Sequence, residues 1–485
     1  MRPFLAVCLC ALALPLSAVA GLSVGVTEDA GKYSRDGGAV FFAQMADVGL
    51  TENAITIFWD ASDPTGIAER GLLDSSVPQA LARGVRVVFA VYPAKPTAWS
   101  GSPVAREQFV AFLRILATTY PQVHDFAVGN EPNQPRYWQP QFNADGSPAA
   151  AAAYEPMLAR AYDALKAVNP RIRVLGLGLS EHGNDNPRAA SNVSTSPVRF
   201  IRDLGAAYRA SGRSTPIMDA LSYHPYPAQN TDSIAKGWAW PNAGVANLDR
   251  IKQAMWDAFN GTAQPTFENG LELAIGEIGW QVGLVPGSAA AYTDKENVSV
   301  TDEANQGAIY GQVVLMLACD PSVSDLLFMH LIDEDVLWGY QSGLVRADGT
   351  RRASYDTVKA AIAQTHGRCA GKPTVWHHTT GVAGATATFG GGITVGSEEE
   401  SSSSAGVVRL AGAPSRHAVS RALEVGVAPL VSSFSDGHLG GGRSATLRFP
   451  LATLAPGSYV YAVSLRATMN PDRSTLLLSQ PFRVS

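Results

Sequence analysis

Hydrophobic and polar positions follow one repeating arrangement from residue 21 to about residue 370. Short apolar runs that are typical of buried strands alternate with longer stretches in which apolar residues recur at helical spacing. The predicted strands are residues 22–27, 54–59, 86–92, 125–129, 173–178, 220–224, 272–277 and 326–331. The predicted helices between them include residues 106–119, 154–168, 198–210, 248–259 and 305–318. This alternation predicts an α/β fold, a closed (β/α)8 barrel over residues 21–370. An open doubly wound sheet is the alternative, but no Gly-x-Gly-x-x-Gly follows the first strand.

The pattern changes after Lys372 and Pro373. Helical periodicity almost disappears, Thr, Ser, Val and Gly become frequent, and residues 459–465 alternate between apolar and polar positions as a half-buried strand does. We therefore expect a small all-β sandwich domain over residues 373–485. Trp376 is the sole tryptophan of this region, so a structural role is favoured over a carbohydrate-binding one.

The first twenty residues have the features of a secretory signal. Arg2 precedes an apolar stretch over residues 4–16, and residues 18–20 read Ala-Val-Ala, the small-x-small pattern of a cleavage site. At about 1.5 Å rise per residue, this stretch is too short to cross a hydrocarbon core of about 30 Å. We predict a signal peptide over residues 1–20, a secreted mature protein and no membrane span.

The cysteine count agrees with export. Removal of the signal leaves Cys319 and Cys369, which we expect to form one disulfide in an oxidising compartment. Two buried free thiols are the alternative. Two thiols do not complete a zinc site, and no metal site is expected.

Composition narrows the possible partners. Hydrophobic residues make up 46% of the chain and charged residues 16%, which is enough apolar material for packed cores. The formal net charge is −5, and no dense basic run is present, which argues against nucleic acid as a partner. We expect a monomer without a cofactor.

Polar and aromatic residues gather where the predicted strands end. The C-terminal ends of barrel strands meet at one mouth, which is where working residues lie in this fold. Carboxylates, amides and aromatic rings together are typical of a sugar site, because rings pack on aromatic faces while hydroxyls need hydrogen-bonding groups. The candidate substrate-binding residues are Glu28, Trp59, Asn130, His224, Tyr226, Trp280 and Trp338.

Two glutamates at these strand ends suit glycosidic-bond cleavage. Glu131 follows the apolar fourth strand and Glu277 ends the seventh, so we expect them to face one another across the mouth. Such cleavage needs one carboxyl group that protonates the leaving oxygen and a second, ionised one that attacks or stabilises the anomeric carbon. For a retaining enzyme we expect the two groups to be about 5–5.5 Å apart.

The segment 129–132, Gly-Asn-Glu-Pro, together with the lone Glu277 resembles clan A of the glycoside hydrolases. That clan comprises retaining (β/α)8 enzymes such as the family 5 cellulases and family 39 xylosidases. The resemblance implies that Glu131 is the acid/base and Glu277 the nucleophile. It also implies that Asn130 bonds the 2-hydroxyl of the sugar and that Tyr226 steadies Glu277.

One departure keeps a second function open. Many clan members carry an arginine near the end of strand two, and residues 52–59 contain none. The main prediction is a secreted retaining glycoside hydrolase that acts on a polysaccharide or oligosaccharide, with β-linkages expected. The alternative is an inactive barrel that binds glycans without cleaving them. A serine hydrolase is disfavoured, because no Gly-x-Ser-x-Gly elbow precedes a helix.

Overall fold

The computed structural model describes residues 21–95, 97–239 and 241–376. Towards the C-terminus it describes residues 386–388, 392–394, 401–409, 430–439, 444–445, 454–467, 474–479 and 482–485. The predicted signal peptide, residues 1–20, lies outside the described residues. Within the described parts, none of the helices combines the length and apolar character that a membrane crossing requires.

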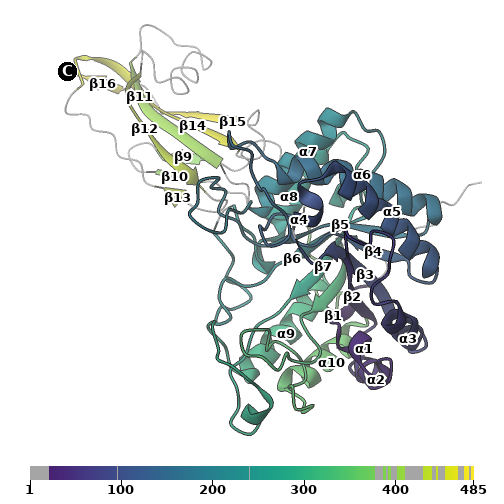
Figure 1. Ribbon diagram of the computed structural model, residues 1–485. Coiled ribbons are helices and arrows are strands. Elements are labelled where there is room, and N and C mark those ends of the chain that lie inside the picture. Colours follow the sequence, from purple (N-terminus) through teal and green to yellow (C-terminus); the bar gives the residue numbers. More distant parts are fainter. Residues whose placement is uncertain are drawn as a thin grey trace, which may run out of the picture.

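Eight parallel strands close into a barrel, because β1 pairs with both β2 and β8 (Figure 1). The strands are β1 Ser23–Thr27, β2 Glu52–Trp59, β3 Arg86–Pro93, β4 Asp125–Val128, β5 Arg173–Ser180, β6 Ala220–His224, β7 Glu272–Ile278 and β8 Val323–Phe328. The predicted (β/α)8 architecture is confirmed. The last strand ends earlier than predicted, because the backbone amides of Leu331 and Ile332 donate to the side chain of Glu28 and not to a neighbouring strand.

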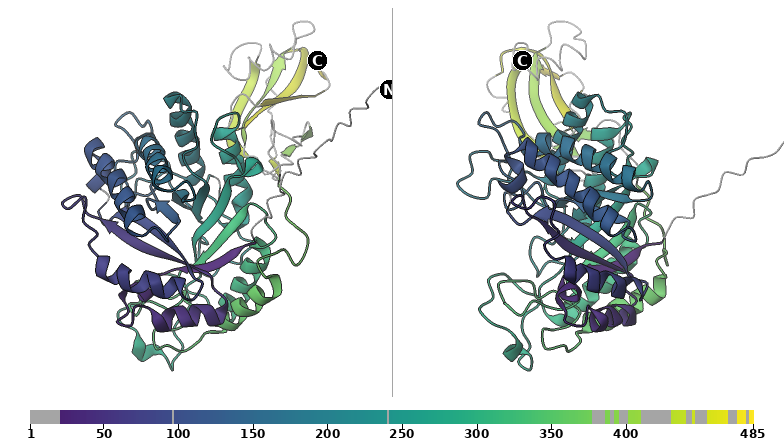
Figure 2. Two further views of the ribbon diagram at one scale, coloured as in Figure 1. Left: turned by 90° about the vertical axis from the view of Figure 1, so that its right-hand side faces the viewer. Right: turned by 45° about the vertical axis from the view of Figure 1, so that its right-hand side comes forward.

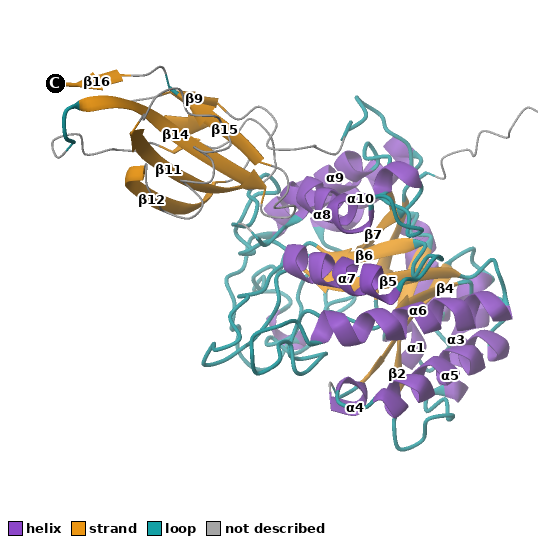
Figure 3. Cartoon of the chain, turned by 90° about the horizontal axis from the view of Figure 1, so that it is seen from above, coloured by secondary structure: helices purple, strands orange, loops and turns teal. Residues whose placement is uncertain are grey.

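Helices cover the outside of the barrel (Figure 3). They are α1 Ala30–Tyr33, α2 Ala39–Val48, α3 Arg70–Leu81, α4 Thr97–Ser100, α5 Pro103–Thr119, α6 Ala150–Val168, α7 Pro197–Ser211, α8 Leu248–Phe259, α9 Glu303–Leu317 and α10 Ala353–Thr365. Strand residues that face the helices are large and apolar. Ile55, Ile57 and Phe89 are fully or almost fully buried there, so most of the core lies between the strands and the helices.

Strand residues that face the barrel interior are mostly small. Small and medium-sized apolar side chains such as Ala54, Ala127 and Ala274 line a narrow cavity of about 30 Å³, which runs from the mouth towards the base of the barrel. Large side chains usually fill the interior of this fold. Here their absence leaves polar groups at both ends of the same cavity, Glu277 at the mouth and Glu52 at the base.

The base of the barrel is an ion-pair network between strand starts. Arg86 lies 2.7 Å from Glu52 and 3.1 Å from Asp125, Arg173 lies 3.1 Å from Asp125, and both arginines bond Asp325. Burial opposes ionisation of Asp325, but Arg173 and Arg86 outweigh it and hold the pKa of Asp325 well below its usual range. Burial and the neighbouring Asp325 raise the pKa of Glu52 well above its ordinary value. When Glu52 is neutral, the guanidinium groups of Arg86 and Arg173 face the carboxylates of Asp125 and Asp325, so the charges of the cluster balance.

The C-terminal region is all-β and projects away from the barrel (Figure 2). Its strands form one antiparallel sheet of order β13-β10-β9 and a second of order β12-β11-β14-β15, in which β16 also pairs with β14. The strands are β9 Thr386–Thr388, β10 Gly392–Thr394, β11 Ser401–Arg409, β12 Leu430–Leu439, β13 Ser444–Ala445, β14 Gly457–Ala467, β15 Ser474–Leu478 and β16 Phe482–Val484. The predicted all-β region is confirmed. The predicted disulfide is also confirmed: Cys319 bonds Cys369 just before the chain leaves the barrel.

Candidate active site

Glu131, His224 and Glu277 meet at the mouth of the barrel, at the ends of β4, β6 and β7. Nδ1 of His224 lies 3.2 Å from Oε1 of Glu131 and 3.8 Å from Oε1 of Glu277. One donor atom from each residue lies within 4.8 Å of the others, so the two carboxyl groups are brought close together. Their side chains are 18% and 17% exposed, which leaves both open to a ligand.

The backbone after β4 holds Glu131 in an unusual conformation. Glu131 has a φ of 38°, a left-handed value that is uncommon for a side chain other than glycine, and Gly129 before it has a φ of 88°. The amide of Glu131 donates to the carbonyl of Gly178 at 2.9 Å. The side chain of Asn133 donates to the carbonyl of Ser180 at 3.1 Å and accepts from its amide at 3.0 Å. These bonds to β5 fix the turn that directs Glu131 towards the mouth. A strained backbone conformation that neighbouring bonds hold in place is common at functional sites.

A local irregularity in β7 brings Glu277 to the barrel interior. The β7–β8 pairing shifts register between Ile275 and Ile278, and Gly276 and Glu277 both line the interior cavity. The Tyr226 hydroxyl donates to Oε2 of Glu277 at 3.0 Å. Burial raises the pKa of Glu277, a change that His224 opposes and Glu131 increases. A donated hydrogen bond stabilises the ionised form of a carboxyl group, so Tyr226 favours the charged Glu277.

His224 lies between the two carboxyl groups and is buried. Burial disfavours its charged form, but Glu277 and Glu131 outweigh this effect and raise the pKa of His224 above its ordinary value. A protonated His224 therefore offsets part of the negative charge at the mouth. His330, at the end of β8, is a second buried histidine whose positive charge lowers the pKa of Glu277.

Aromatic side chains around the mouth include several that sequence reasoning missed. Phe58 lies 5.5 Å from Tyr92, and Tyr92 lies 5.8 Å from Tyr137, between ring centroids, so the ends of β2 and β3 and the loop after β4 carry one aromatic row. Tyr340 lies 6.0 Å from Tyr226. Burial, with smaller effects of Glu131 and Glu277, raises the pKa of Tyr137. Alternation could have found Phe58, because it shares the parity of Ala54, which faces the interior.

Two predicted sugar-binding tryptophans are core residues. Trp59 is 2% exposed and packs edge-on against Phe109 of α5. Trp280 is fully buried, contacts Tyr310 of α9 and donates its indole N–H to the carbonyl of Asp232 at 3.0 Å. Neither ring presents a face to a ligand. The prediction for Trp59 was wrong because the last residue of β2 faces the helix layer and not the barrel interior.

Two further residues that were predicted to bind the sugar, Glu28 and Trp338, bond to other protein groups. Oε2 of Glu28 accepts the amides of Leu331 and Ile332 at 3.2 Å, and Oε1 accepts the amide of Ala30 at 3.2 Å. Glu28 therefore ties the loop after β8 to β1 and is a structural residue. Trp338 is 63% exposed, and its indole N–H donates to Asp294 at 3.2 Å, with no contact to either glutamate described. Asn130, by contrast, lines the interior cavity beside Glu277.

Glu131, His224 and Glu277 could also contact a single cation, and they are the only such group among the residues that the structure describes. The partners already present argue for acid–base use, since His224 bonds one glutamate and Tyr226 the other.

The fold and the site together define a (β/α)8 barrel with two carboxyl groups paired at its C-terminal mouth, the position where barrel enzymes carry their catalytic residues.

Solved structures with a similar fold are glycoside hydrolases. A family 39 glycoside hydrolase from Bacteroides cellulosilyticus WH2 has 16% identity and a TM-score of 0.47, over 82% of this chain and 74% of that one. A GH39 β-xylosidase from Caulobacter crescentus has 16% identity and a TM-score of 0.45, over 90% and 95%. GH5_18 from Streptomyces cattleya, in complex with GlcNAc, has 16% identity and a TM-score of 0.47, over 73% and 82%.

No protein-family model matches the chain, and no curated protein matches its sequence. With 16% identity and TM-scores below 0.5, these similarities concern the fold alone.

Proposed function

We propose that this protein is a retaining glycoside hydrolase that cleaves β-linked O-glycosidic bonds in a polysaccharide or oligosaccharide. The observation that carries this proposal is the pair of glutamates at the mouth, with carboxylate oxygens of Glu131 and Glu277 within 4.8 Å. Retaining enzymes hold their two carboxyl groups about 5–5.5 Å apart, whereas inverting enzymes need about 6.5–9.5 Å to admit a water between them. The close pair supports the retaining mechanism.

In the first step, protonated Glu131 gives its proton to the departing glycosidic oxygen. Ionised Glu277 attacks the anomeric carbon, and the glycosidic bond breaks as a glycosyl–Glu277 ester forms. In the second step, Glu131 takes a proton from a water, and the resulting hydroxide displaces Glu277 and restores both starting groups. The Tyr226 hydroxyl bonds Glu277 and supports its ionised state before attack.

Neighbouring groups suit a sugar ring in the cleavage position. Asn130 lines the same cavity as Glu277, and its side-chain amide can bond a hydroxyl beside the anomeric carbon. Phe58, Tyr92 and Tyr137 offer apolar ring surface and a phenolic oxygen on two of the three residues. We assign no cofactor to this reaction.

Export is the proposed route for the protein. The signal-like residues 1–20 and the disulfide between Cys319 and Cys369 both support an oxidising compartment outside the cytoplasm.

The second candidate function is glycan binding without cleavage, and the missing strand-two arginine motivates it. Two other groups stand beside Glu277: His224 at 3.8 Å and Tyr226 at 3.0 Å. Because these can supply the positive charge and the hydrogen bond that an arginine would provide, hydrolysis is the better-supported function.

The test compares the wild-type protein with Glu277→Ala on a panel of β-linked polysaccharides and aryl glycosides. Glu272→Ala is the matched control, because it changes a glutamate at the opposite end of the same strand. We expect sugar release from the wild type and the control but not from Glu277→Ala, and NMR should show a product that first keeps the β-configuration. Equal release by all three proteins would refute the role of Glu277, and release of the α-anomer would refute the retaining mechanism.

A further inference from the structure

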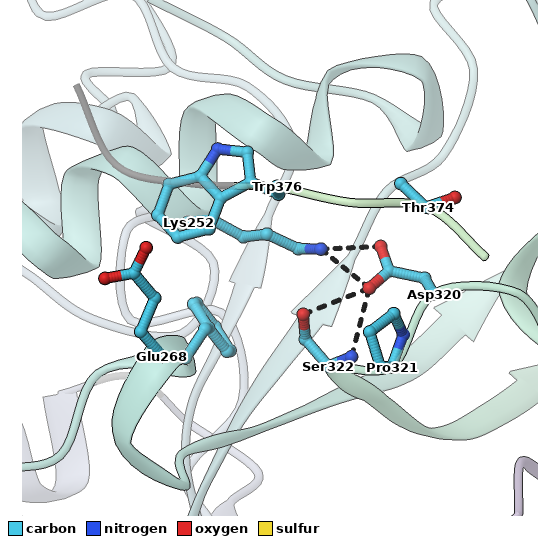
Figure 4. Close-up of a pocket in the computed structure, with 8 residues that line it drawn as sticks. Lys252, Glu268, Asp320, Pro321, Ser322, Thr374 and Trp376 are labelled. Carbon is cyan, nitrogen blue, oxygen red and sulfur yellow. Dashed lines mark hydrogen bonds and ion pairs between the residues drawn. The ribbon is translucent and has the colours of Figure 1, made fainter.

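A second pocket lies at the other end of the barrel, beside the linker to the C-terminal region. Its volume is about 510 Å³ (Figure 4). It is lined by Phe267 and Glu268 from the short turn before β7, by Asp320 from the loop before β8, and by Trp376 from the linker. Glu277 stands near the far end of β7, which has seven residues, so at about 3.3 Å per residue the pocket lies roughly 20 Å from the catalytic pair.

The floor of this pocket is a neutralised ion pair. Nζ of Lys252 lies 2.7 and 2.6 Å from the two oxygens of Asp320, and the side chains are only 2% and 9% exposed. The amide and hydroxyl of Ser322 also donate to Asp320, each at 3.0 Å. Because the charges cancel and both carboxylate oxygens are occupied, the floor offers no excess charge to select a phosphate or a metal ion.

The walls combine aromatic and hydrogen-bonding surface. Figure 4 shows the indole of Trp376 beside the side chain of Lys252, with Thr374 and Glu268 at the edges of the pocket. Phe267 adds a second ring. An aromatic face bordered by hydroxyl and carboxylate groups suits a sugar, whose ring C–H groups pack on the aromatic face while its hydroxyls bond the rim. The volume is within the range of about 300–1,000 Å³ typical of ligand pockets.

Two bonds attach the linker to the barrel at this point. Cys369 is joined to Cys319 by the disulfide, and the amide of Thr374 donates to the carbonyl of Cys319 at 2.7 Å. Both bonds converge on the residue before Asp320. Trp376, two residues beyond Thr374, is therefore held over the floor, which makes the pocket a built feature of the barrel base.

We propose that this pocket is a non-catalytic binding site for a neutral oligosaccharide segment, which would retain a polymer chain whose bonds are cleaved at the mouth. The choice of a glycan as occupant rests in part on the proposed function. Binding at the pocket and cleavage at the mouth are nevertheless separable, because they use different residues at opposite ends of the strands.

The test uses the full chain carrying Glu277→Ala, which prevents cleavage, and measures calorimetric binding of cellohexaose, xylohexaose and mannohexaose. We expect at least one probe to bind at two sites, and Trp376→Ala to remove one site or weaken it at least tenfold. Val375→Ala is the matched control, since it changes an exposed linker residue next to Trp376 that does not line the pocket, and it should change nothing. Glu268→Gln serves as a second pocket variant if Trp376→Ala fails to fold, and a several-fold loss of affinity is expected.

Disulfide removal gives an independent readout. The double variant Cys319→Ser with Cys369→Ser should weaken the second site, because it releases the linker, and leave the first site unchanged. Unchanged binding in both pocket variants, or one site or none for all three probes, overturns the proposal.

Measurements of hydrolysis distinguish a failure of the pocket assignment from a failure of the proposed function. With an active mouth, Trp376→Ala should hydrolyse a small aryl glycoside at the wild-type rate. If the wild type cleaves no glycoside but binding depends on Trp376, the proposed function fails while the pocket assignment stands. If the wild type cleaves a glycoside but binding does not depend on Trp376, the pocket assignment fails while the proposed function stands.

Discussion

Both ends of the barrel hold carboxyl groups on strands or just after them, yet their charges are arranged differently. At the base, Asp125 and Asp325 face Arg86 and Arg173, and burial raises the pKa of Glu52 well above its ordinary value. At the mouth, Glu131 and Glu277 share one histidine between them. At the base, the two arginines pair with the buried carboxylates. At the mouth the two glutamates are partly exposed, so a substrate can reach both carboxyl groups.

The residues around the two groups of carboxylates also differ between the base and the mouth. Above the base, small apolar residues such as Ala54 and Ala274 separate the ion pairs from the mouth. Around the mouth, aromatic rings and an asparagine surround the glutamates. Substitutions at the base should therefore change stability, and substitutions at the mouth should change activity.

The largest effect is expected for Glu131→Gln. Loss of the proton donor should lower the rate by about 10²–10⁴-fold on a glycoside with a poor leaving group, because that is the usual contribution of general acid–base catalysis. The first step on an activated aryl glycoside, such as a dinitrophenyl glycoside, needs little protonation and should slow much less. Burst kinetics with both substrates measure this difference, and equal losses would remove the acid role from Glu131.

The next effect is expected at the base, for Asp325→Asn. Removing the charge of the buried Asp325, which pairs with two arginines, should lower the free energy of unfolding by about 3–5 kcal/mol. Urea denaturation measures it, with Glu272→Gln as control, since the Glu272 side chain is itself 48% exposed and a surface pair is worth about 1 kcal/mol or less. The pKa of Asp325 is depressed in the folded state, so its contribution is complete above the ordinary value of about 3.9 and is lost as the pH falls below it. Equal losses for both variants would contradict the comparison.

A smaller effect concerns the pH dependence of the mouth. Burial raises the pKa of Glu277, so the acid limb of kcat/KM should lie above the ordinary value for glutamate. The titratable groups that face Glu277 are His224, Glu131, Tyr226 and His330. His224→Asn removes a positive charge that opposes the rise in the pKa, so the acid limb should move to higher pH. Rates between pH 4 and 8 test this, and a shift to lower pH would contradict it.

The smallest effect is expected for Glu52→Gln. Because the pKa of Glu52 is raised on folding, the native protein takes up a proton there, and its stability should fall as the pH rises above the ordinary value of about 4.3. Gln imitates the neutral acid without that proton uptake. The variant should therefore unfold within about 1 kcal/mol of the wild type at pH 7 and lose less stability between pH 5 and 7. A loss as large as that of Asp325→Asn would show that Glu52 is ionised.

Much of the fold could be predicted from local patterns. The eight strands were found in order, because each is an apolar run bounded by polar loops, and parallel strands buried on both sides have that appearance. The two catalytic candidates were found because strand ends converge in a barrel. The tryptophans were the main errors: Trp59 and Trp280 end strands as Glu277 does, but their rings turn into the helix layer.

What the sequence determined by itself is the order of elements, the change to an all-β region, the cysteine pair and the strand ends that carry Glu131 and Glu277. These depend on residue type and spacing along the chain. Only the tertiary structure decided which carboxylates are balanced by arginines and which are left beside a histidine. It also decided that Phe58, Tyr92 and Tyr137 form a row, and that the linker lies over Lys252 and Asp320. The physical reason is that charge balance, burial and ring contacts depend on distances between residues far apart in the chain, and those distances exist only once the barrel has closed.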